Sequence, residues 1–513
     1  MADHVVDVLV VGAGVSGIGA AFRLQTECPD HTYAVVEARD AIGGTWDLFR
    51  FPGVRSDSDI FTFCYPFRPW DGDQSLADGE DIRRYVEQVA AENGIDRRIH
   101  FGTRVVSASW SSAEARWTVR TASAAGVQTW SCAFLYACAG YYDHAGGHTP
   151  SFPGQQDFGG PVVHPQSWPA DLDVTGQRVV VIGSGATAVT LVPALAGTAA
   201  RVTMLQRSPT WVTAQSRSDP FANRLRRRLP AGLAHHLIRT RNLAVSQAFY
   251  ALSRRRPALA RSFLRGRIAG RMGEQFTAEH FTPSYDPWDQ RLCVIPDGDL
   301  MRAITRGDAS VVTDTIERFV PEGVRLTSGR VLPADVIVTA TGLRMRLLGG
   351  MALDVDGKPV VLAEHALYRG LMLDGVPNFA VAIGYINASW SLRADIASRY
   401  VCRFLRHLTR HGLGYGYPVR PPDLVEQPLM PLSSGYVRRA LPHLPVQGSA
   451  GPWLMPQNYL RDLIGMRRAD LGQDMHLVPH RHGAGPARPS RAGRTRSAAD
   501  PAGPPLLVTR TPS

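Results

Sequence analysis

The chain has 513 residues, which is too many for one compact hydrophobic core, so we expect two or three domains. Its formal net charge is +11, and arginine supplies nearly all of the positive charge because Lys358 is the only lysine. No apolar run reaches the roughly 18 residues of a membrane span, and the N-terminus shows neither a basic region nor a cleavage site. We therefore expect a cytoplasmic protein without a signal peptide or a transmembrane helix. The six cysteines lack the spacing of a zinc site, so no metal is expected.

A glycine-rich loop follows the first predicted strand. The apolar segment VVDVLVV runs into G-x-G-x-x-G at Gly12, Gly14 and Gly17, and a helix-like segment comes next. The glycines allow a tight turn and close approach to a pyrophosphate, which the helix N-terminus would bind through free N–H groups. Glu37 ends the next strand, where its carboxylate would accept hydrogen bonds from ribose hydroxyls and repel a 2′-phosphate. The loop is therefore predicted to bind FAD or NAD and to reject NADP.

A second loop repeats this design with one informative change. The strand RVVVI leads into GSGATA, in which alanine takes the third glycine position, and the following strand ends in Arg207 and Ser208. An arginine and a hydroxyl at that place favour a 2′-phosphate through charge-assisted hydrogen bonds. The chain is thus predicted to be an α/β protein with two Rossmann-like domains, the first for FAD and the second for NADPH. The predicted NADPH-binding residues are Gly183, Gly185, Thr187, Ala188, Arg207 and Ser208.

The stretch between the two loops carries the most specific pattern. Residues 158–169 follow F-x-G-x-x-x-H-x-x-x-W-P, with Phe158, Gly160, His164 and Trp168 at four fixed positions. This pattern resembles the fingerprint of Baeyer–Villiger monooxygenases. The resemblance implies conversion of ketones to esters or lactones with NADPH and O2, through a C4a-peroxyflavin, and also oxidation of sulfur compounds. The alternative is a heteroatom-oxygenating flavin monooxygenase, a class that usually carries Tyr or Phe at the position of Trp168.

The place of the fingerprint suggests what its residues do. In the family that the chain resembles, the stretch belongs to a linker between the two domains. His164 and Trp168 are therefore expected to couple domain rotation to the position of the nicotinamide, and His164 is not expected to transfer protons.

A second motif of the same family, G-G-x-W-x4-[FY]-P-G-x3-D, matches residues 43–57. The resemblance places this motif along the flavin ring. Gly44 and Thr45 would bind the cofactor, Trp46 would shield the isoalloxazine, and Asp57 would face the reaction space. Turn capping is the alternative role of Asp57.

The catalytic cation is assigned by resemblance to one branch of the family. The better-known branch carries its arginine in a K-R-P triplet, which this chain lacks. Residues 281–300 align so that Arg291 takes the arginine position, while Gln290 replaces a lysine that contacts NADPH phosphate. The chain from about residue 5 to about residue 470 resembles the ethionamide-activating monooxygenases of mycobacteria. The resemblance implies that Arg291, oriented by Asp57, stabilises the peroxyflavin, a contribution of about a hundredfold or more in rate. A salt bridge is the alternative role of Arg291.

Two short segments are predicted to carry the chain between the domains. YACAG, residues 136–140, would lead out of the FAD domain, and DVIVTATG, which ends in Thr341 and Gly342, would lead back to it. The expected organisation is an FAD domain (1–150), a fingerprint linker (151–175), an NADPH domain (176–215), a basic helical insertion (216–280), the rest of the NADPH domain (281–342), the rest of the FAD domain (343–478) and a disordered tail rich in Arg, Pro, Gly and Ala (479–513).

The predicted insertion has an unusual charge. Residues 221–272 contain thirteen arginines and no acidic residue, with apolar side chains at near-helical spacing. Three interpretations stay open: a solvated helical face, contact with an anionic membrane that delivers lipophilic ketones, and nucleic-acid binding, which the few aromatic side chains disfavour. A hypothesis of another class is an inert flavin fold that binds anionic surfaces, but the intact cofactor motifs argue against it. No motif identifies the physiological ketone or the oligomeric state.

Overall fold

A nine-stranded sheet holds the first glycine loop. Its strands follow the order β18-β17-β4-β5-β6-β1-β2-β3, and β21 pairs with β6 beside this path. β1, β2 and β6 are parallel and fully buried where they lead to the loop. The structure is a computed structural model that describes residues 2–480, so the tail expected to be disordered lies outside the described residues from residue 481 on. The strands are β1 His4–Val11, β2 Tyr33–Val36, β3 Ile99–His100, β4 Arg104–Ser111, β5 Arg116–Ser123, β6 Gly126–Ala137, β17 Ala352–Val355, β18 Lys358–Pro359 and β21 Phe379–Val381.

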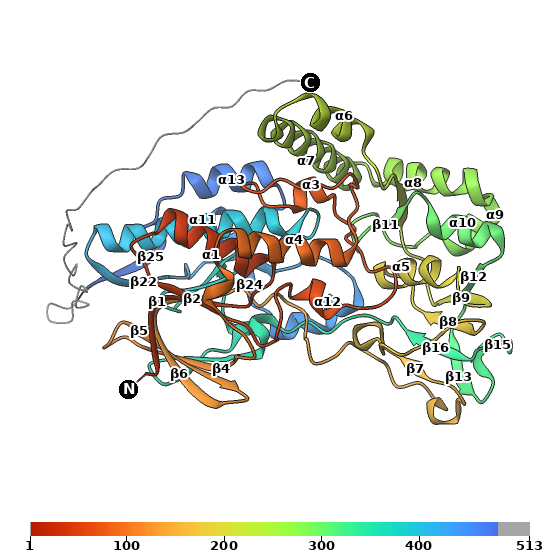
Figure 1. Cartoon of the computed structure of the whole chain (residues 1–513), viewed down its shortest axis with the longest axis horizontal. Helices are drawn as coiled ribbons and strands as arrows, with labels where there is room; N and C mark the ends of the chain where they lie inside the picture. Colours follow the sequence, from red (N-terminus) through yellow and green to blue (C-terminus); the bar gives the residue numbers. More distant parts are fainter. Residues whose placement is uncertain (1, 481–513) are drawn as a thin grey trace, which may run out of the picture. The chain divides into compact units, whose positions relative to one another are not determined.

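The last third of the chain returns to this first sheet. β17 pairs in parallel with β4, and β21 pairs in parallel with β6. Helix α11 (Trp390–Arg410) packs along α1 (Val15–Glu27), so that the red N-terminal helix and the blue late helix lie side by side in Figure 1. The first cofactor domain is therefore built from two segments separated by the second.

The second sheet has five parallel strands in the order β12-β9-β8-β16-β7. Its central strands β8 and β16 are continuous apolar runs, as expected for strands that are covered on both faces. This parallel sheet and the parallel strands β1, β2 and β6 of the mixed first sheet confirm the predicted α/β class. The elements are β7 Val162–Val163, β8 Arg178–Ile182, β9 Arg201–Gln206, β12 Ala309–Thr313, β16 Val336–Thr339, α5 Ala186–Leu195 and α10 Asp299–Arg306, with the meander β13 Ile316–Val320, β14 Gly323–Leu326 and β15 Val331–Pro333.

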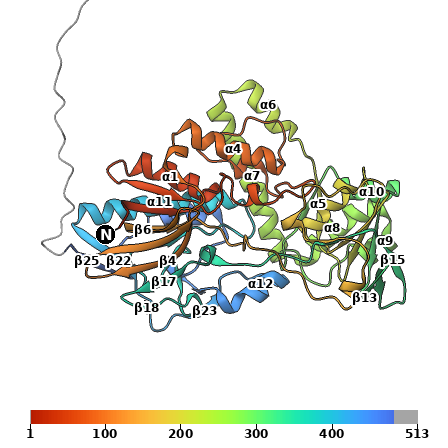
Figure 2. The same ribbon diagram turned by 60° about the horizontal axis from the view of Figure 1, so that its bottom comes forward.

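The predicted helical insertion lies between β10 (Val212–Gln215) and β11 (Cys293–Pro296), which pair with each other in parallel. It consists of four helices: α6 Pro220–Arg228, α7 Ala231–Arg255, α8 Pro257–Met272 and α9 Glu274–His280. Figures 1 and 2 both show α6 and α7 together, and α7 packs against the short helix α3 (Ile60–Phe63) of the first domain.

The two segments that cross between the sheets are hydrogen-bonded to each other. The N–H of Asp143 donates to the Arg344 oxygen at 2.9 Å, and the N–H of Arg346 donates to the Tyr141 oxygen at 2.9 Å. The N–H of His148 also donates to the Gly342 oxygen at 2.9 Å. The outward and the returning connection thus form one paired strip between the two cofactor domains.

The other described elements complete the first domain. No helix among residues 2–480 combines the length and the apolar character needed to cross a bilayer. These elements are α2 Thr45–Leu48, α4 Gly79–Glu92, α12 Gly435–Ala440, α13 Tyr459–Arg467, β19 Leu367–Tyr368, β20 Met372–Leu373, β22 Leu413–Pro418, β23 Glu426–Pro428, β24 Val446–Gly448 and β25 Met475–Pro479.

Candidate active site

The first glycine loop is shaped by close contacts that only glycine allows. Gly12 has φ +106°, and a Cβ there would lie 2.8 Å from the Cys138 oxygen. A Cβ on Gly17 would lie 1.7 Å from the Gly12 oxygen, so α1 packs directly onto the end of β1. The first residues of α1 consequently line a cavity, where their N–H groups can meet an anion.

Glu37 supports this loop from the end of β2. Its Oε2 accepts a hydrogen bond from the Ala13 N–H at 2.7 Å, and its Oε1 accepts one from the Arg39 N–H at 2.8 Å. Burial raises the pKa of the carboxyl, while these N–H groups oppose that rise. Glu37 lines the same cavity, so it is placed to meet a ribose hydroxyl there.

The second family motif meets the first glycine loop. A Cβ on Gly14 would lie 3.5 Å from the Gly44 Cα, and Gly44 itself has φ +57°. Gly44 begins helix α2, which carries Trp46, and the Trp46 ring makes an edge contact with Phe63 at 5.7 Å between centroids. Two glycine motifs that are separate in sequence therefore form one continuous wall.

Asp57 and Arg55 bring opposite charges to the far end of this wall. Burial raises the pKa of Asp57 to about 6, although Arg55, the Val294 N–H and Arg291 all favour its ionised form. The Arg55 side chain is 3% exposed, and its Nη2 donates to the Val294 oxygen at 3.3 Å. Arg55 was not among the predicted site residues, although its position inside the 43–57 motif, two residues before Asp57, was a signal that could have identified it.

Arg291 lies at the same end, among tyrosines. Its Nη2 donates to the Tyr141 hydroxyl at 3.4 Å, and that hydroxyl donates to the Tyr142 hydroxyl at 3.2 Å. The Arg291 side chain is exposed, and it lines the cavity. Burial raises the pKa of Tyr436 to about 12, and Arg291 limits that rise. Arg291 and Asp57 share the cavity without forming an ion pair with each other.

The cavity that these residues line has a volume of about 330 Å³. That volume is within the range usual for ligand pockets. It brings together nine of the residues predicted from the sequence and also takes in the N-terminus of α11 through Ala388 and Trp390. The nine are Gly12, Gly14, Glu37, Gly44, Thr45, Trp46, Asp57, Thr187 and Arg291.

The second glycine loop reaches the cavity through Ala186 and Thr187. A Cβ on Gly183 would lie 2.3 Å from the Ala340 oxygen, whereas a Cβ on Gly185 would meet no atom within 4 Å. Ala188 is fully buried against the second sheet. The Ser184 hydroxyl donates to the Ser208 oxygen at 3.0 Å, which holds the predicted phosphate-binding pair, Arg207 and Ser208, beside the loop with both side chains exposed.

The fingerprint residues lie outside the cavity. Phe158 packs in a small core of the second domain, and a Cβ on Gly160 would lie 2.1 Å from the Asp335 oxygen. The Nδ1 of His164 accepts from the Gln166 N–H at 3.1 Å, so the Nε2–H is the one that donates to the Gly342 oxygen, also at 3.1 Å. Trp168 packs against the core of the second domain.

Thr341 and Gly342 belong to the paired strip between the domains. The Thr341 hydroxyl donates to the His148 oxygen at 2.6 Å. His164 also binds Gly342, so the fingerprint is tied to the returning connection by a side chain.

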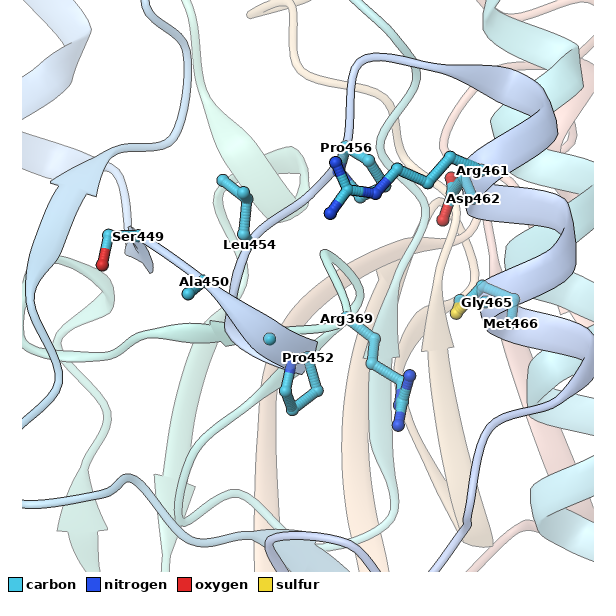
Figure 3. A pocket seen from close by; sticks show the side chains of 11 residues that line it. Arg369, Ser449, Ala450, Pro452, Leu454, Pro456, Arg461, Asp462, Gly465 and Met466 are labelled. Atoms are coloured by element: carbon cyan, nitrogen blue, oxygen red, sulfur yellow. The ribbon is translucent and has the colours of Figure 1, made fainter.

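A second pocket, of about 280 Å³, lies between residues 449–456 and α13 (Figure 3). None of the predicted site residues lines it. One hydrogen bond connects it to the first cavity: Tyr385 lines that cavity and its hydroxyl donates to Asp462 Oδ2 at 2.6 Å, while Asp462 lines the second pocket. Asp462 also pairs with the fully buried Arg393 at 2.9 Å.

Comparison with known proteins places this site in a family. The sequence profile of the flavin-binding monooxygenase-like family matches residues 6–247. The FAD-containing monooxygenase EthA of Mycobacterium tuberculosis is 49% identical over 477 residues, which cover 92% of this chain and 97% of EthA. The chain belongs to the flavin-binding monooxygenase-like family. The putative FAD-containing monooxygenase MymA of Mycobacterium tuberculosis is 48% identical to this chain over 464 residues, which cover 89% of this chain and 94% of MymA.

The fold of this flavin-binding monooxygenase-like chain also has solved counterparts. An oxidised steroid monooxygenase bound to NADP superposes with a TM-score of 0.73, at 23% identity, over 93% of this chain and all of the other. The two-domain architecture predicted from the glycine loops is thus confirmed.

Proposed function

We propose that this protein is an FAD- and NADPH-dependent Baeyer–Villiger monooxygenase that converts ketones to esters or lactones. The observation that carries the proposal is the single cavity that joins the first glycine loop, the Trp46 motif, Thr187 of the second loop and Arg291. The relatives named above, described as FAD-containing monooxygenases, and the NADP-bound steroid monooxygenase support the two cofactors.

The residues at the first loop fit FAD. Gly12, Gly14 and the α1 N-terminus would take the pyrophosphate, and Glu37 would take the ribose. Gly44, Thr45 and Trp46 would hold the ring system. Bound FAD accepts hydride from NADPH and activates O2 for transfer, so the difficult chemistry belongs to the cofactor.

The residues at the second loop fit NADPH. Gly185 leaves open space where a pyrophosphate can approach, and Arg207 offers charge to a 2′-phosphate. Thr187 would be the point at which NADPH enters the shared cavity. His164 would fix the linker through Gly342, and thereby the angle between the two domains.

The chain's own contribution to the reaction is a fixed positive charge. Oxygen insertion develops negative charge on oxygen, and Arg291 lines the cavity, where its guanidinium donates to the Tyr141 hydroxyl. Asp57 carries its negative charge above a pH of about 6, where it would balance Arg55 and hold Arg291 toward the reaction space.

Product analysis under ¹⁸O2 tests this function. The purified yellow protein would be supplied with NADPH and either phenylacetone or 2-octanone, and we expect an ester that contains one ¹⁸O atom. Sulfoxide from thioanisole without any ester would favour a heteroatom oxygenase instead. NADPH oxidation that is slow and independent of every substrate would favour the inert flavin fold.

A further inference from the structure

The basic platform, by which we mean helices α6 to α8, carries more positive charge than the structure neutralises. Seven of its thirteen arginines are bound to acidic side chains or main-chain oxygens. The other six have no such partner within residues 2–480, and all six are exposed. These six are Arg224, Arg227, Arg228, Arg255, Arg256 and Arg271.

The same platform exposes an apolar helical face. On α7, Ala234, His235 and Ile238 are buried, while Leu237 and Leu252 are 45% and 48% exposed. Sixteen large hydrophobic side chains are strongly exposed in the described part of the chain, and seven of them lie in this tenth of it. The seven are Phe221, Leu233, Leu237, Val245, Leu252, Leu259 and Phe263. Such a concentration marks an interaction surface.

The platform is attached to the wall of the active-site cavity. The buried Arg239 of α7 donates to the main-chain oxygens of Phe61, Thr62 and Cys64 at 3.2, 3.2 and 2.8 Å. These residues form helix α3 and its end, and Phe63 lines the cavity. Figure 1 shows α7 next to α3, in agreement with the packing of the two helices. A partner bound to the platform would therefore lie close to the cavity wall.

We propose that the basic platform docks on the surface of an anionic lipid bilayer. The exposed apolar face of α7 would enter the interfacial region, and the six unpartnered arginines would meet lipid phosphates. Both halves of the surface are then satisfied by one partner, because a bilayer offers negative headgroups above an apolar layer. The proposal does not depend on the reaction proposed above.

Charge excludes the other occupants of this face. A second copy of the chain would bring two arginine-rich, acid-free surfaces together. The chain's own tail carries six arginines and one aspartate over residues 481–513, so it is repelled by the same surface. A nucleic acid would satisfy the arginines but leave the aliphatic side chains in water, with only Phe221 and Phe263 exposed for base stacking.

Vesicle sedimentation of the flavin-loaded full chain tests the proposal. The vesicles would be phosphatidylcholine with or without about a quarter phosphatidylglycerol. We expect binding at least about tenfold tighter to the anionic vesicles, since each arginine near such a surface contributes about fivefold. The double variant Arg227→Glu and Arg228→Glu should weaken binding more than about tenfold, whereas Arg330→Glu, a matched exposed arginine elsewhere, should not.

A second variant isolates the apolar face. Leu237→Ser with Leu252→Ser should weaken binding at high salt, where headgroup attraction is screened, while Val127→Ser with Val425→Ser, at more exposed positions elsewhere, should not. Both pairs should turn over a water-soluble ketone as the wild type does. The proposal would be overturned by equal binding to both vesicle types or by a leucine double variant that binds as the wild type does. Tighter binding of single-stranded RNA than of vesicles would also overturn it, as would a dimer in solution that the leucine substitutions dissociate.

Discussion

Replacing Asp57 by Asn should change how the stability of the protein depends on pH. Burial raises the pKa of Asp57 from 3.8 to about 6 in the folded protein. The folded state therefore keeps this proton when the unfolded chain has lost it, and stability falls as the pH rises from about 4 to about 6. At about 1.4 kcal/mol for each pH unit the full difference is about 3 kcal/mol. The water that reaches Asp57 from the cavity reduces it to about 2 to 3 kcal/mol.

Urea unfolding of wild type and Asp57→Asn between pH 4 and pH 7.5 would measure this. The Asn side chain cannot ionise. The unfolding free energy of the variant minus that of the wild type should therefore increase as the pH rises, and this difference should become constant above a pH of about 6. Asp30→Asn, at an exposed position, is the matched control and should run parallel to the wild type. A difference between wild type and Asp57→Asn that stays constant within about 0.5 kcal/mol would refute the placement of Asp57 in a shielded site.

Three further substitutions have distinct expected outcomes. Arg291→Ala should lower ester formation by about a hundredfold or more while NADPH oxidation continues and H2O2 accumulates, which the ratio of ester to consumed NADPH would show. Gly17→Ala should prevent FAD binding, because its Cβ would lie 1.7 Å from a main-chain oxygen; Gly185→Ala, with open space around it, should fold and retain flavin absorbance but show a higher KM for NADPH. Asp462→Asn leaves the buried Arg393 without its counter-ion, so unfolding free energy should fall by about 3 to 5 kcal/mol in a denaturant titration, and an unchanged midpoint would contradict that assignment.

The parts of the site that could be predicted from the sequence are those whose positions depend on residues nearby in the chain. Gly17 could be identified because its close contact, with the Gly12 oxygen, is made within one strand-turn-helix unit, and Gly12 because the turn of that unit requires its positive φ. Glu37 could be placed because it ends the strand beside that unit. The helical insertion was also predictable, since the apolar side chains of residues 221–272 have near-helical spacing and no acidic residue interrupts that stretch.

The missed residues owe their position to tertiary contacts. Tyr436 reaches Arg291 from helix α12, far along the chain, and no spacing rule connects the two. Tyr141 and Tyr142 directly follow the predicted outward crossing, yet only the structure shows that they turn toward Arg291. The fingerprint could be recognised from its sequence pattern, but its position could not be predicted. Its residues lie outside the cavity because the linker strand β7 pairs with β16.

The split construction of the first cofactor domain has a consequence for biosynthesis. β4 and β6 are made early, but their partners β17 and β21 leave the ribosome only after the whole second sheet has been translated. Until then the nascent first sheet has unpaired strand edges, the kind of surface that invites association with other chains. The order of synthesis therefore makes the second sheet the earlier of the two to be complete, and chaperone demand should be greatest while the ribosome translates residues 140–380.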